Sequence, residues 1–449
     1  MRIACIHIPQ YALQCATRLD PSLRGAPVAM VAQGNGAGPL HAPIVVACSR
    51  AAWALGVRLG MTAAAARHVS SELSVVSVEP QLERETLRAL AESLLALTGV
   101  VDAGGRVGAG GAHLALYAEV PAKTRGNAFG ERVLERLAEL GLTGRVGIAD
   151  DRFTAWVAAA YGAVGQRLGD HGGCAQDAAH QDVITVARGG SAAFLAPRPL
   201  SLLAIAPEVQ HMLEVLGVRT LGEFAALPAP SVARPLEADY QALARGDSGT
   251  LLRPYAPEAA LREEIVVRGG NVLDGAGLIG GPTAIALLAR RIALRLAGRG
   301  RGALKLELAV IAGDTTTERA LDLAAPLADP DELARLLSPV LDAVPASPWR
   351  LRVIVTGEAV EQAEAMPDDT AASAPLVEVS AAMRSGDARL LADPLAVVLA
   401  TPGTLFSLSA PEVAGRPGLE RAHRRTRRGK QRRHRPAAAA LGLFDRTGG

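Results

Sequence analysis

Short apolar strands alternate with helical patterns over roughly the first 165 residues, and this alternation restricts the fold more than any other feature of the sequence. The first strand, Ile3–Ile8, is rich in β-branched residues, and Pro9 ends it. The clearest helix has an amphipathic pattern from Leu82 to Gly99. Further strands are predicted at residues 26–32, 43–49, 73–79, 113–120 and 144–150. Together these elements predict an α/β or α+β domain built around one sheet.

The length and the composition indicate a large globular protein. With 449 residues, the chain can form roughly two to four domains. The mean hydropathy is +0.20, but we find neither a signal peptide nor an apolar run of the ~18 residues that a membrane span needs. Cys5, Cys15, Cys48 and Cys174 form no CxxC pair, which is typical of buried thiols in a reducing compartment. We therefore expect a cytoplasmic protein that does not bind membranes.

Positive charge is concentrated near the C-terminus. Residues 421–435 hold nine Lys or Arg and no acid, whereas the rest of the chain has 38 basic residues against 45 acidic ones. Such an acidic body is unusual for a protein that holds DNA tightly by itself. The basic run is predicted to lie along DNA or to contact partner proteins, although a solvated tail has the same composition.

A helical hairpin is predicted in the middle of the chain. Two short helices, Pro207–Leu216 and Thr220–Leu227, are joined by a tight turn at Gly217, and Thr220 caps the second helix. Hairpins of this kind direct backbone N–H groups at phosphates. The pattern therefore predicts a DNA-backbone site at Gly217, Arg219 and Thr220, although an ordinary helical corner also favours a glycine.

A further unit begins at about residue 251. Its predicted elements follow the order β-α-β-β-α-β, which is typical of a small ferredoxin-like sandwich. The second helix of this unit has Asp329 as its N-cap and Pro330 at its first position. Beyond Glu361 the chain turns polar and loop-like, and it ends in the basic tail.

Several stretches, taken in order, resemble the Y-family translesion DNA polymerases of the UmuC type. They are "SRAAWALGVRLGM", "VGIADDRFTAWVAAAYG", "LEVLGVRTLGEFAALP" and "LARGDSGTLLRPYAPEAALREEIVV". The likeness covers roughly Met1 to Glu358 and is greatest for the catalytically degenerate, ImuB-like branch. It implies an α+β multidomain fold. The expected domains are a palm with fingers at 1–165, a thumb with a helix-hairpin-helix at 166–248, a ferredoxin-like little finger at 249–360, and a linker with a disordered basic tail at 361–449.

The resemblance also shows which residues occupy the positions of the family's catalytic carboxylates. Nucleotidyl transfer uses two Mg²⁺ ions held by carboxylates. The first acidic positions fall on His7 and Pro9, and the second pair falls on or near Gly110 and Gly111. Asp102 is the only acid nearby, and we assign it to a loop turn. The sequence therefore predicts no catalytic residues, no metal and no cofactor.

Other positions that bind the nucleotide in this family have changed as well. The fingers Tyr and Arg fall on Arg50 and Trp53, and the aromatic residue that discriminates the sugar falls on Ala12, next to Tyr11. Arg50 can still reach phosphate, but Trp53 has no guanidinium fork.

Two further groups of reactive side chains have structural explanations. Asp150 and Asp151 precede a helix and are interpreted as its N-cap and first-turn acids. His171, Cys174 and His180 do not have the spacing of a zinc site, so we assign them to a surface loop.

The C-terminal residues resemble the peptide that binds the bacterial sliding clamp, whose pattern is Gln-Leu-x-Leu-Phe. The matching segment is Ala440, Leu441, Gly442, Leu443 and Phe444, with Ala440 in place of the glutamine. A disordered tail can offer such apolar residues to a preformed pocket. A second, poorer candidate is Pro402–Phe406, which contains Leu405 and Phe406.

In the family, the little finger straddles duplex DNA. Arg299, Arg301 and Lys305 follow the first helix of that unit or lie at its end, and they are candidates for phosphate contacts, although they also fit a solvated helix face. With only 3% aromatic residues, base stacking is not expected, so any contact with DNA should be to its backbone and sensitive to salt.

These observations predict a non-catalytic adaptor in DNA damage tolerance and SOS-type mutagenesis. The expected partners are primer–template DNA, the sliding clamp, an error-prone polymerase and a RecA-like accessory protein of the same cassette. Two alternatives remain open: an active translesion polymerase whose carboxylates lie in another register, and a DNA-binding repair protein with no link to the clamp.

Overall fold

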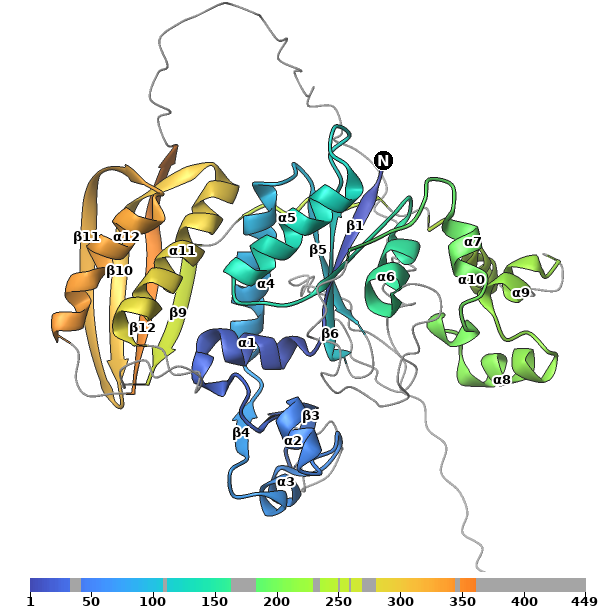
Figure 1. Cartoon of the computed structure of the whole chain (residues 1–449), viewed down its shortest axis with the longest axis horizontal. Helices are drawn as coiled ribbons and strands as arrows, with labels where there is room; N and C mark the ends of the chain where they lie inside the picture. Colours follow the sequence, from blue (N-terminus) through green and yellow to red (C-terminus); the bar gives the residue numbers. More distant parts are fainter. Residues whose placement is uncertain are drawn as a thin grey trace, which may run out of the picture. The chain divides into compact units, whose positions relative to one another are not determined.

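The computed structural model describes residues 1–32, 42–107, 111–162, 183–228, 235–248, 251–257, 260–268, 280–343 and 348–360. In these residues the chain forms three β-sheets and a helical segment, so the fold is mixed α/β (Figure 1). The tail at 361–449 and the candidates His171, Cys174 and His180 lie outside the described residues. Within the ranges described, we find no helix that is both long and apolar enough to cross a lipid bilayer.

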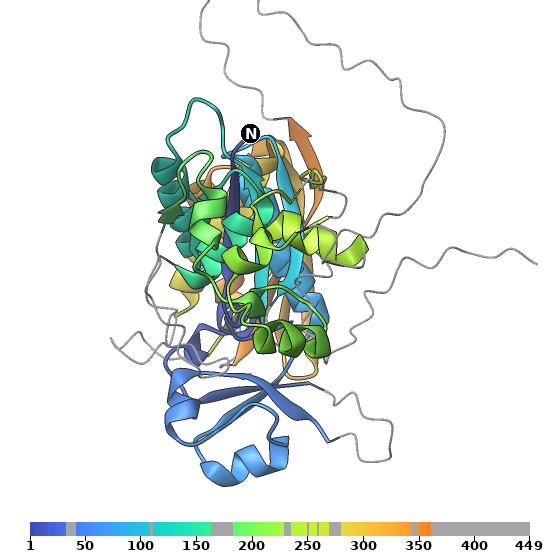
Figure 2. The ribbon, with the colours of Figure 1, turned by 90° about the vertical axis from the view of Figure 1, so that its right-hand side faces the viewer.

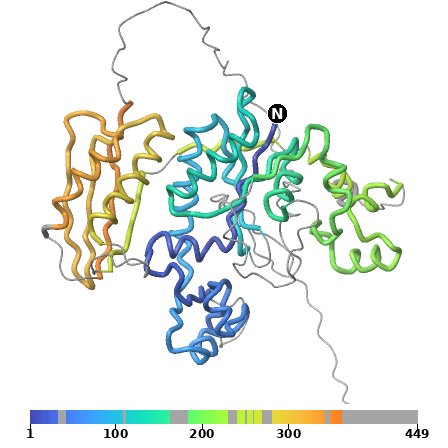
Figure 3. The backbone as a smooth tube through the Cα atoms, viewed as in Figure 1, coloured from blue at the N-terminus to red at the C-terminus, as the bar shows by residue number. Residues whose placement is uncertain are grey.

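The largest sheet has the first strand of the chain in its middle. β1 (Ile3–Ile8) pairs antiparallel with β6 (His113–Glu119) on one side and with β7 (Arg145–Ala149) on the other. In Figure 3, β1 is the dark blue segment that begins at the N-terminus. β5 (Val101–Val107) and the short β8 (Val183–Thr185) complete the order β5-β6-β1-β7-β8. The N-terminal strand is therefore enclosed by later segments of the chain.

Both faces of this five-stranded sheet are covered, which explains why β1 is buried at every position. Ile6 belongs to a core formed with α4 (Pro80–Leu95) and α5 (Gly126–Glu139). Cys5 points to the other face, into a core that includes α6 (Arg152–Tyr161). The positions of β1, β6, β7, α4 and α6 agree with the sequence pattern to within a few residues, whereas β5 and β8 were not predicted.

Of the two acids before α6, Asp151 has the N-cap role that the sequence indicates, whereas Asp150 precedes the cap and is not a first-turn acid. Asp151 is the N-cap, and its carboxylate accepts a hydrogen bond of 2.9 Å from the backbone N–H of Thr154. Asp150 forms an ion pair of 3.1 Å with Arg2 and accepts a 2.6 Å hydrogen bond from the backbone N–H of Gly189. These contacts fix the start of α6 against the sheet.

A separate three-stranded sheet has the order β3-β2-β4. β2 (Val28–Ala32) pairs antiparallel with β3 (Ile44–Cys48) and parallel with β4 (Ser74–Ser77), so β4 is an edge strand in the described part of the chain. Two short helices, α2 (Arg50–Ala54) and α3 (Ala63–Val69), pack on this sheet, whose strands can be followed in blue in Figure 2.

The helical segment contains the predicted hairpin. Its helices are α7 (Ser191–Leu195), α8 (Pro207–Val215), α9 (Leu221–Ala226) and α10 (Pro235–Ala244). Gly217 turns the chain with φ +88°, a conformation that favours glycine. Thr220 caps α9 through a capping box with Glu223. The local geometry of the hairpin thus agrees with the sequence signals.

The last of the described segments with regular structure, residues 261–360, has the predicted β-α-β-β-α-β order. Its elements are β9 (Leu261–Val267), α11 (Gly281–Arg299), β10 (Arg301–Ala312), β11 (Thr315–Leu327), α12 (Pro330–Leu337) and β12 (Trp349–Val360). The strand order is β11-β10-β12-β9, and every neighbouring pair is antiparallel. Asp329 caps α12 with Pro330 at its first position, as predicted.

A buried group of charges joins α11 to α4, and we call Glu92, Glu263, Arg18, Arg295 and Arg299 the Glu92 cluster. The Glu92 carboxylate accepts hydrogen bonds of 2.6 Å from Arg295 and 2.7 Å from Arg299. Glu263 lies 2.6 Å from Arg18 and 3.1 Å from Arg295. Burial opposes ionisation of Glu263, but the two arginines outweigh it and lower the pKa of this carboxyl group.

Candidate functional site

The carboxyl end of β1 is the position where the family resemblance places the chemistry. His7 is paired across the sheet with Ala115 of β6 and with Arg145 of β7. Pro9 then ends the strand, and Gln10 adopts a left-handed conformation with φ 47° just before α1 (Tyr11–Leu19). The strand therefore delivers an imidazole, rather than a carboxylate, to the edge of this site.

A second imidazole lies beside His7. The ring centroids of His7 and His113 are 5.2 Å apart, and Nδ1 of His113 accepts a 3.1 Å hydrogen bond from the backbone N–H of Gln10. Sequence reasoning missed His113, although it is the first residue of the strand that follows the predicted acidic turn. Only the pairing of β1 with β6 brings the two histidines together.

Both imidazoles are neutral at pH 7. Burial lowers the pKa of His7 well below its usual range, and the nearby His113 and Arg145 lower it further. Burial, followed by the positive charge of Arg106, lowers the pKa of His113 to about 4. Nδ1 of His7 is buried and has no hydrogen-bond partner among the described residues.

These two histidines make stability depend on pH. The unfolded chain takes up a proton on each histidine near pH 6.5, but in the native chain the pKa of His113 is about 4 and that of His7 is well below 6.5. The contribution of these neutral histidines to the free energy of unfolding is therefore complete above about pH 6.5 and is lost as the pH falls towards 4. For each histidine, the free energy of unfolding changes by up to about 1.4 kcal/mol per pH unit. We expect His113→Gln to reduce this slope in urea unfolding between pH 4 and 6.5. The exposed His68→Gln serves as the control, and equal slopes in the two variants would contradict the prediction.

The residues at this site do not fit a pair of magnesium ions. Magnesium prefers oxygen ligands in octahedral geometry, whereas His7 and His113 offer nitrogen and Pro9 offers no ligand. The described residues contain no group of three His, Cys, Asp or Glu that could hold a metal. Gly110 lies outside the described residues, and Gly111 has φ +67° and supplies no side-chain ligand.

Asp102 makes the local turn contact that was predicted, because its carboxylate accepts a 2.9 Å hydrogen bond from the backbone N–H of Gly104 at an irregular point of the β5–β6 pairing, but it lies in a strand and not in a loop. It lies within β5, opposite Tyr117, and is almost completely buried. Its carboxylate forms a 3.2 Å ion pair with Arg152 and accepts a 2.9 Å hydrogen bond from the backbone N–H of Arg253. Sequence spacing could not show this role, because its partners come from distant parts of the chain.

Of the positions that correspond to nucleotide contacts, Trp53 and Ala12 pack within the protein itself, as does the neighbouring Tyr11, whereas Arg50 is exposed. Tyr11 is buried and its hydroxyl donates a 2.6 Å hydrogen bond to the backbone carbonyl of Glu83, while Arg106 lies over its ring. The Trp53 ring is covered by the guanidinium of Arg58, 4.0 Å from the ring centroid. Ala12 is buried in a core with Val28 and Met30 of the three-stranded sheet.

The hairpin does not present free backbone donors where the sequence predicts them. The N–H groups of Arg219 and Thr220 donate hydrogen bonds of 2.8 and 2.9 Å to the Glu223 carboxylate. These bonds lower the pKa of Glu223. The N–H of Gly217 is bonded to Glu214 of α8. A phosphate here would meet an acid already bound to two of the donors, which leaves the exposed Arg219 side chain for any contact.

The three basic residues predicted to contact phosphate lie in different environments. Arg299 belongs to the Glu92 cluster, with its side chain 7% exposed and its guanidinium also 2.6 Å from Glu358. Arg299 is therefore an interior residue, in contrast to the expected surface position. Arg301 is exposed, and Lys305 is 65% exposed beside Asp322 at 3.4 Å.

This chain is similar to several known proteins. Among solved structures, DinB from Sulfolobus solfataricus matches 80% of this chain over 100% of its own length, with 13% identity and a TM-score of 0.42. A ternary insertion complex of Dbh DNA polymerase matches 79% of this chain over 98% of its own length, with 14% identity and a TM-score of 0.43. No match was found among curated proteins. Residues 6–160, which include His7 near the end of β1, match the model of the impB/mucB/samB family.

Proposed function

We propose that this protein is a non-catalytic, polymerase-shaped adaptor in DNA damage tolerance. The observation that carries the proposal is the His7–His113 pair, which stands at the end of β1 inside the segment that matches the impB/mucB/samB family. Two neutral imidazoles cannot supply the negative charge that paired magnesium ions need. Because metal-bound charge stabilisation is the main source of catalysis in this chemistry, a chain without it can grip DNA but cannot extend it.

Weak contacts with DNA fit this role. Of the predicted hairpin donors, two are bonded to Glu223, and Arg299 is committed to the Glu92 cluster. The exposed Arg219, Arg301 and Lys305 remain as candidates for backbone contacts. An adaptor of low affinity gains by tethering, because a second attachment raises its effective concentration at the DNA. We assign this attachment to the tail at 440–444, which would dock on the sliding clamp while the protein recruits an error-prone polymerase and a RecA-like partner.

A primer-extension assay tests the loss of catalysis. We expect the purified full-length chain to give no template-dependent extension with Mg²⁺ or with Mn²⁺. In the same preparation, fluorescence anisotropy should show binding to primer–template DNA at low salt that weakens steeply as salt is raised. Extension that follows the template would establish the chain as an active translesion polymerase instead.

A pulldown with the bacterial sliding clamp tests the attachment. We expect replacement of Leu443 and Phe444 by Ala to reduce binding at least tenfold, because these apolar side chains would fill the pocket of the clamp. Replacement of Leu405 and Phe406 by Ala is the matched control and should leave binding unchanged. If neither double variant weakens binding, the protein acts on DNA without this link.

A further inference from the structure

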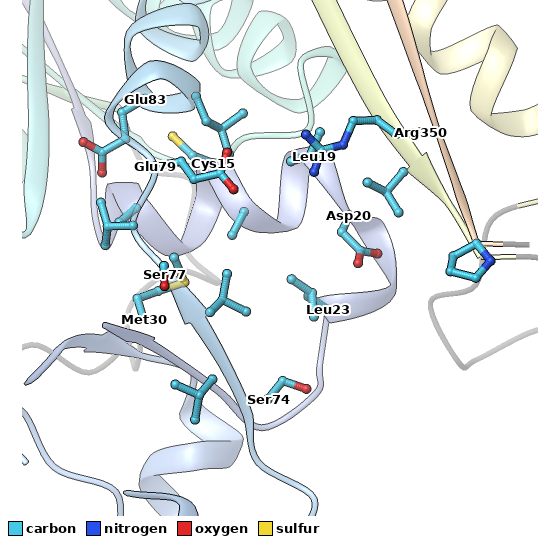
Figure 4. Close-up of a pocket in the computed structure, with 18 of the residues that line it drawn as sticks. Cys15, Leu19, Asp20, Leu23, Met30, Ser74, Ser77, Glu79, Glu83 and Arg350 are labelled. Atoms are coloured by element: carbon cyan, nitrogen blue, oxygen red, sulfur yellow. The ribbon is translucent and has the colours of Figure 1, made fainter. Parts of the chain in front are cut away.

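A pocket of about 570 Å³ opens beside the three-stranded sheet (Figure 4). One wall is formed by α1, which turns the small side chains of Ala12, Cys15 and Ala16 to the pocket. The opposite wall is β4, and every residue from Ser74 to Glu79 lines the space. The small residues of α1 leave room that bulkier side chains would fill.

Among the described residues, no strand pairs with the edge of β4 that faces away from β2. The N–H groups of Ser74 and Val78 donate hydrogen bonds of 2.9 Å to Pro27 and Val31, on the β2 side. Because alternate residues of a parallel strand point their backbone groups to opposite sides, Val75 and Ser77 direct theirs to the free edge. An edge of this kind is a ready template for another strand.

The charges around the pocket are arranged unevenly. Arg268 and Arg350 line one end together with Asp20, and the two arginine side chains are 50% and 35% exposed. Glu79 and Glu83, at the start of α4, line the pocket elsewhere. Arg268 is paired with the buried Asp20 at 2.7 Å, and Arg350 lies 3.5 Å from Glu264. The ion pair of Arg350 is long, and the guanidinium keeps donors for a further carboxylate. An acidic side chain of an incoming segment would be favoured at this end.

We propose that the β4 edge and this pocket form a docking site for an extended segment of a partner protein. The segment adds a strand to β4 through Val75 and Ser77, places apolar side chains over Ala12 and Ala16, and sets an Asp or Glu beside Arg350. This inference concerns recognition of another protein and is independent of whether the chain is catalytic or binds the clamp.

Panning a phage library of random dodecapeptides against the full-length chain tests the site. We expect enriched peptides to combine β-branched residues with an Asp or Glu. Ser77→Pro removes only an outward-facing N–H from an exposed position of an edge strand, so the fold is retained. We expect it to weaken binding of the enriched peptides at least tenfold, whereas Ser77→Ala, which keeps the N–H, should bind them normally.

A second variant tests whether Arg350 causes the preference for acidic peptides. Panning against Arg350→Glu should replace the enriched acid with Lys or Arg. The proposal is overturned if no peptides are enriched, if Ser77→Pro binds them as well as Ser77→Ala does, or if Arg350→Glu selects the same acidic peptides. It is also overturned if sedimentation shows dimers that Ser77→Pro dissociates, because the edge would then pair with a second copy of this chain.

Discussion

Glu92→Gln is expected to lower the free energy of unfolding by about 3–5 kcal/mol, the cost of breaking a buried ion pair on one side. The Glu92 side chain is 1% exposed and compensates Arg295 and Arg299, which are 0% and 7% exposed. Its carboxylate also accepts a 3.2 Å hydrogen bond from the hydroxyl of Tyr255. A neutral amide leaves two buried guanidinium groups with too little negative charge around them. Urea unfolding followed by circular dichroism measures the change.

The matched control for this variant is an exposed ion pair. Arg290 of α11 and Glu139 of α5 lie 2.6 Å apart, but their side chains are 56% and 27% exposed. Because water screens such a pair, Glu139→Gln should cost only about 0–1 kcal/mol. If Glu92→Gln and Glu139→Gln have the same effect, the Glu92 cluster does not hold α11 against α4.

Gly298→Ala is expected to destabilise the protein by about 3 kcal/mol, although alanine is the better helix former. A Cβ at position 298 would collide with the backbone carbonyl oxygen of Glu92 and stand 2.7 Å from its carbonyl carbon. Both atoms belong to the backbone of α4 and cannot rotate away, so α11 and α4 would have to separate. That movement would also stretch the hydrogen bonds from Arg295 and Arg299 to Glu92.

Gly300→Ala is the control, two residues further on. Gly300 has φ +63°, and a Cβ there would meet nothing within 4 Å. The cost is then only that of the left-handed conformation, about 1–2 kcal/mol. Thermal unfolding of the two variants measures the difference. A Gly298→Ala protein as stable as the wild type would show that the two helices are not in backbone contact.

The sequence by itself determined most elements of this protein and their order; β5 and β8, which it did not predict, pair with β6 and β7 in the sheet. The β-branched run ended by Pro9 specified β1, Thr220 and Gly217 specified the hairpin, and Asp329 with Pro330 specified the start of α12. These signals are local, because caps, turns and hydrophobic periods act between residues close in the chain. The absence of acids at His7 and Pro9 was likewise visible without any structure.

Only the tertiary structure decided which side chains meet. It brought His113 beside His7, it placed Asp102 against Arg152, and it turned Arg299 into the interior towards Glu92. It also showed that Glu223 is bound to the hairpin donors expected to bind phosphate. Such contacts join residues far apart in the chain or depend on exact side-chain placement. Charge and spacing alone therefore cannot distinguish an arginine that faces DNA from one that neutralises a buried acid.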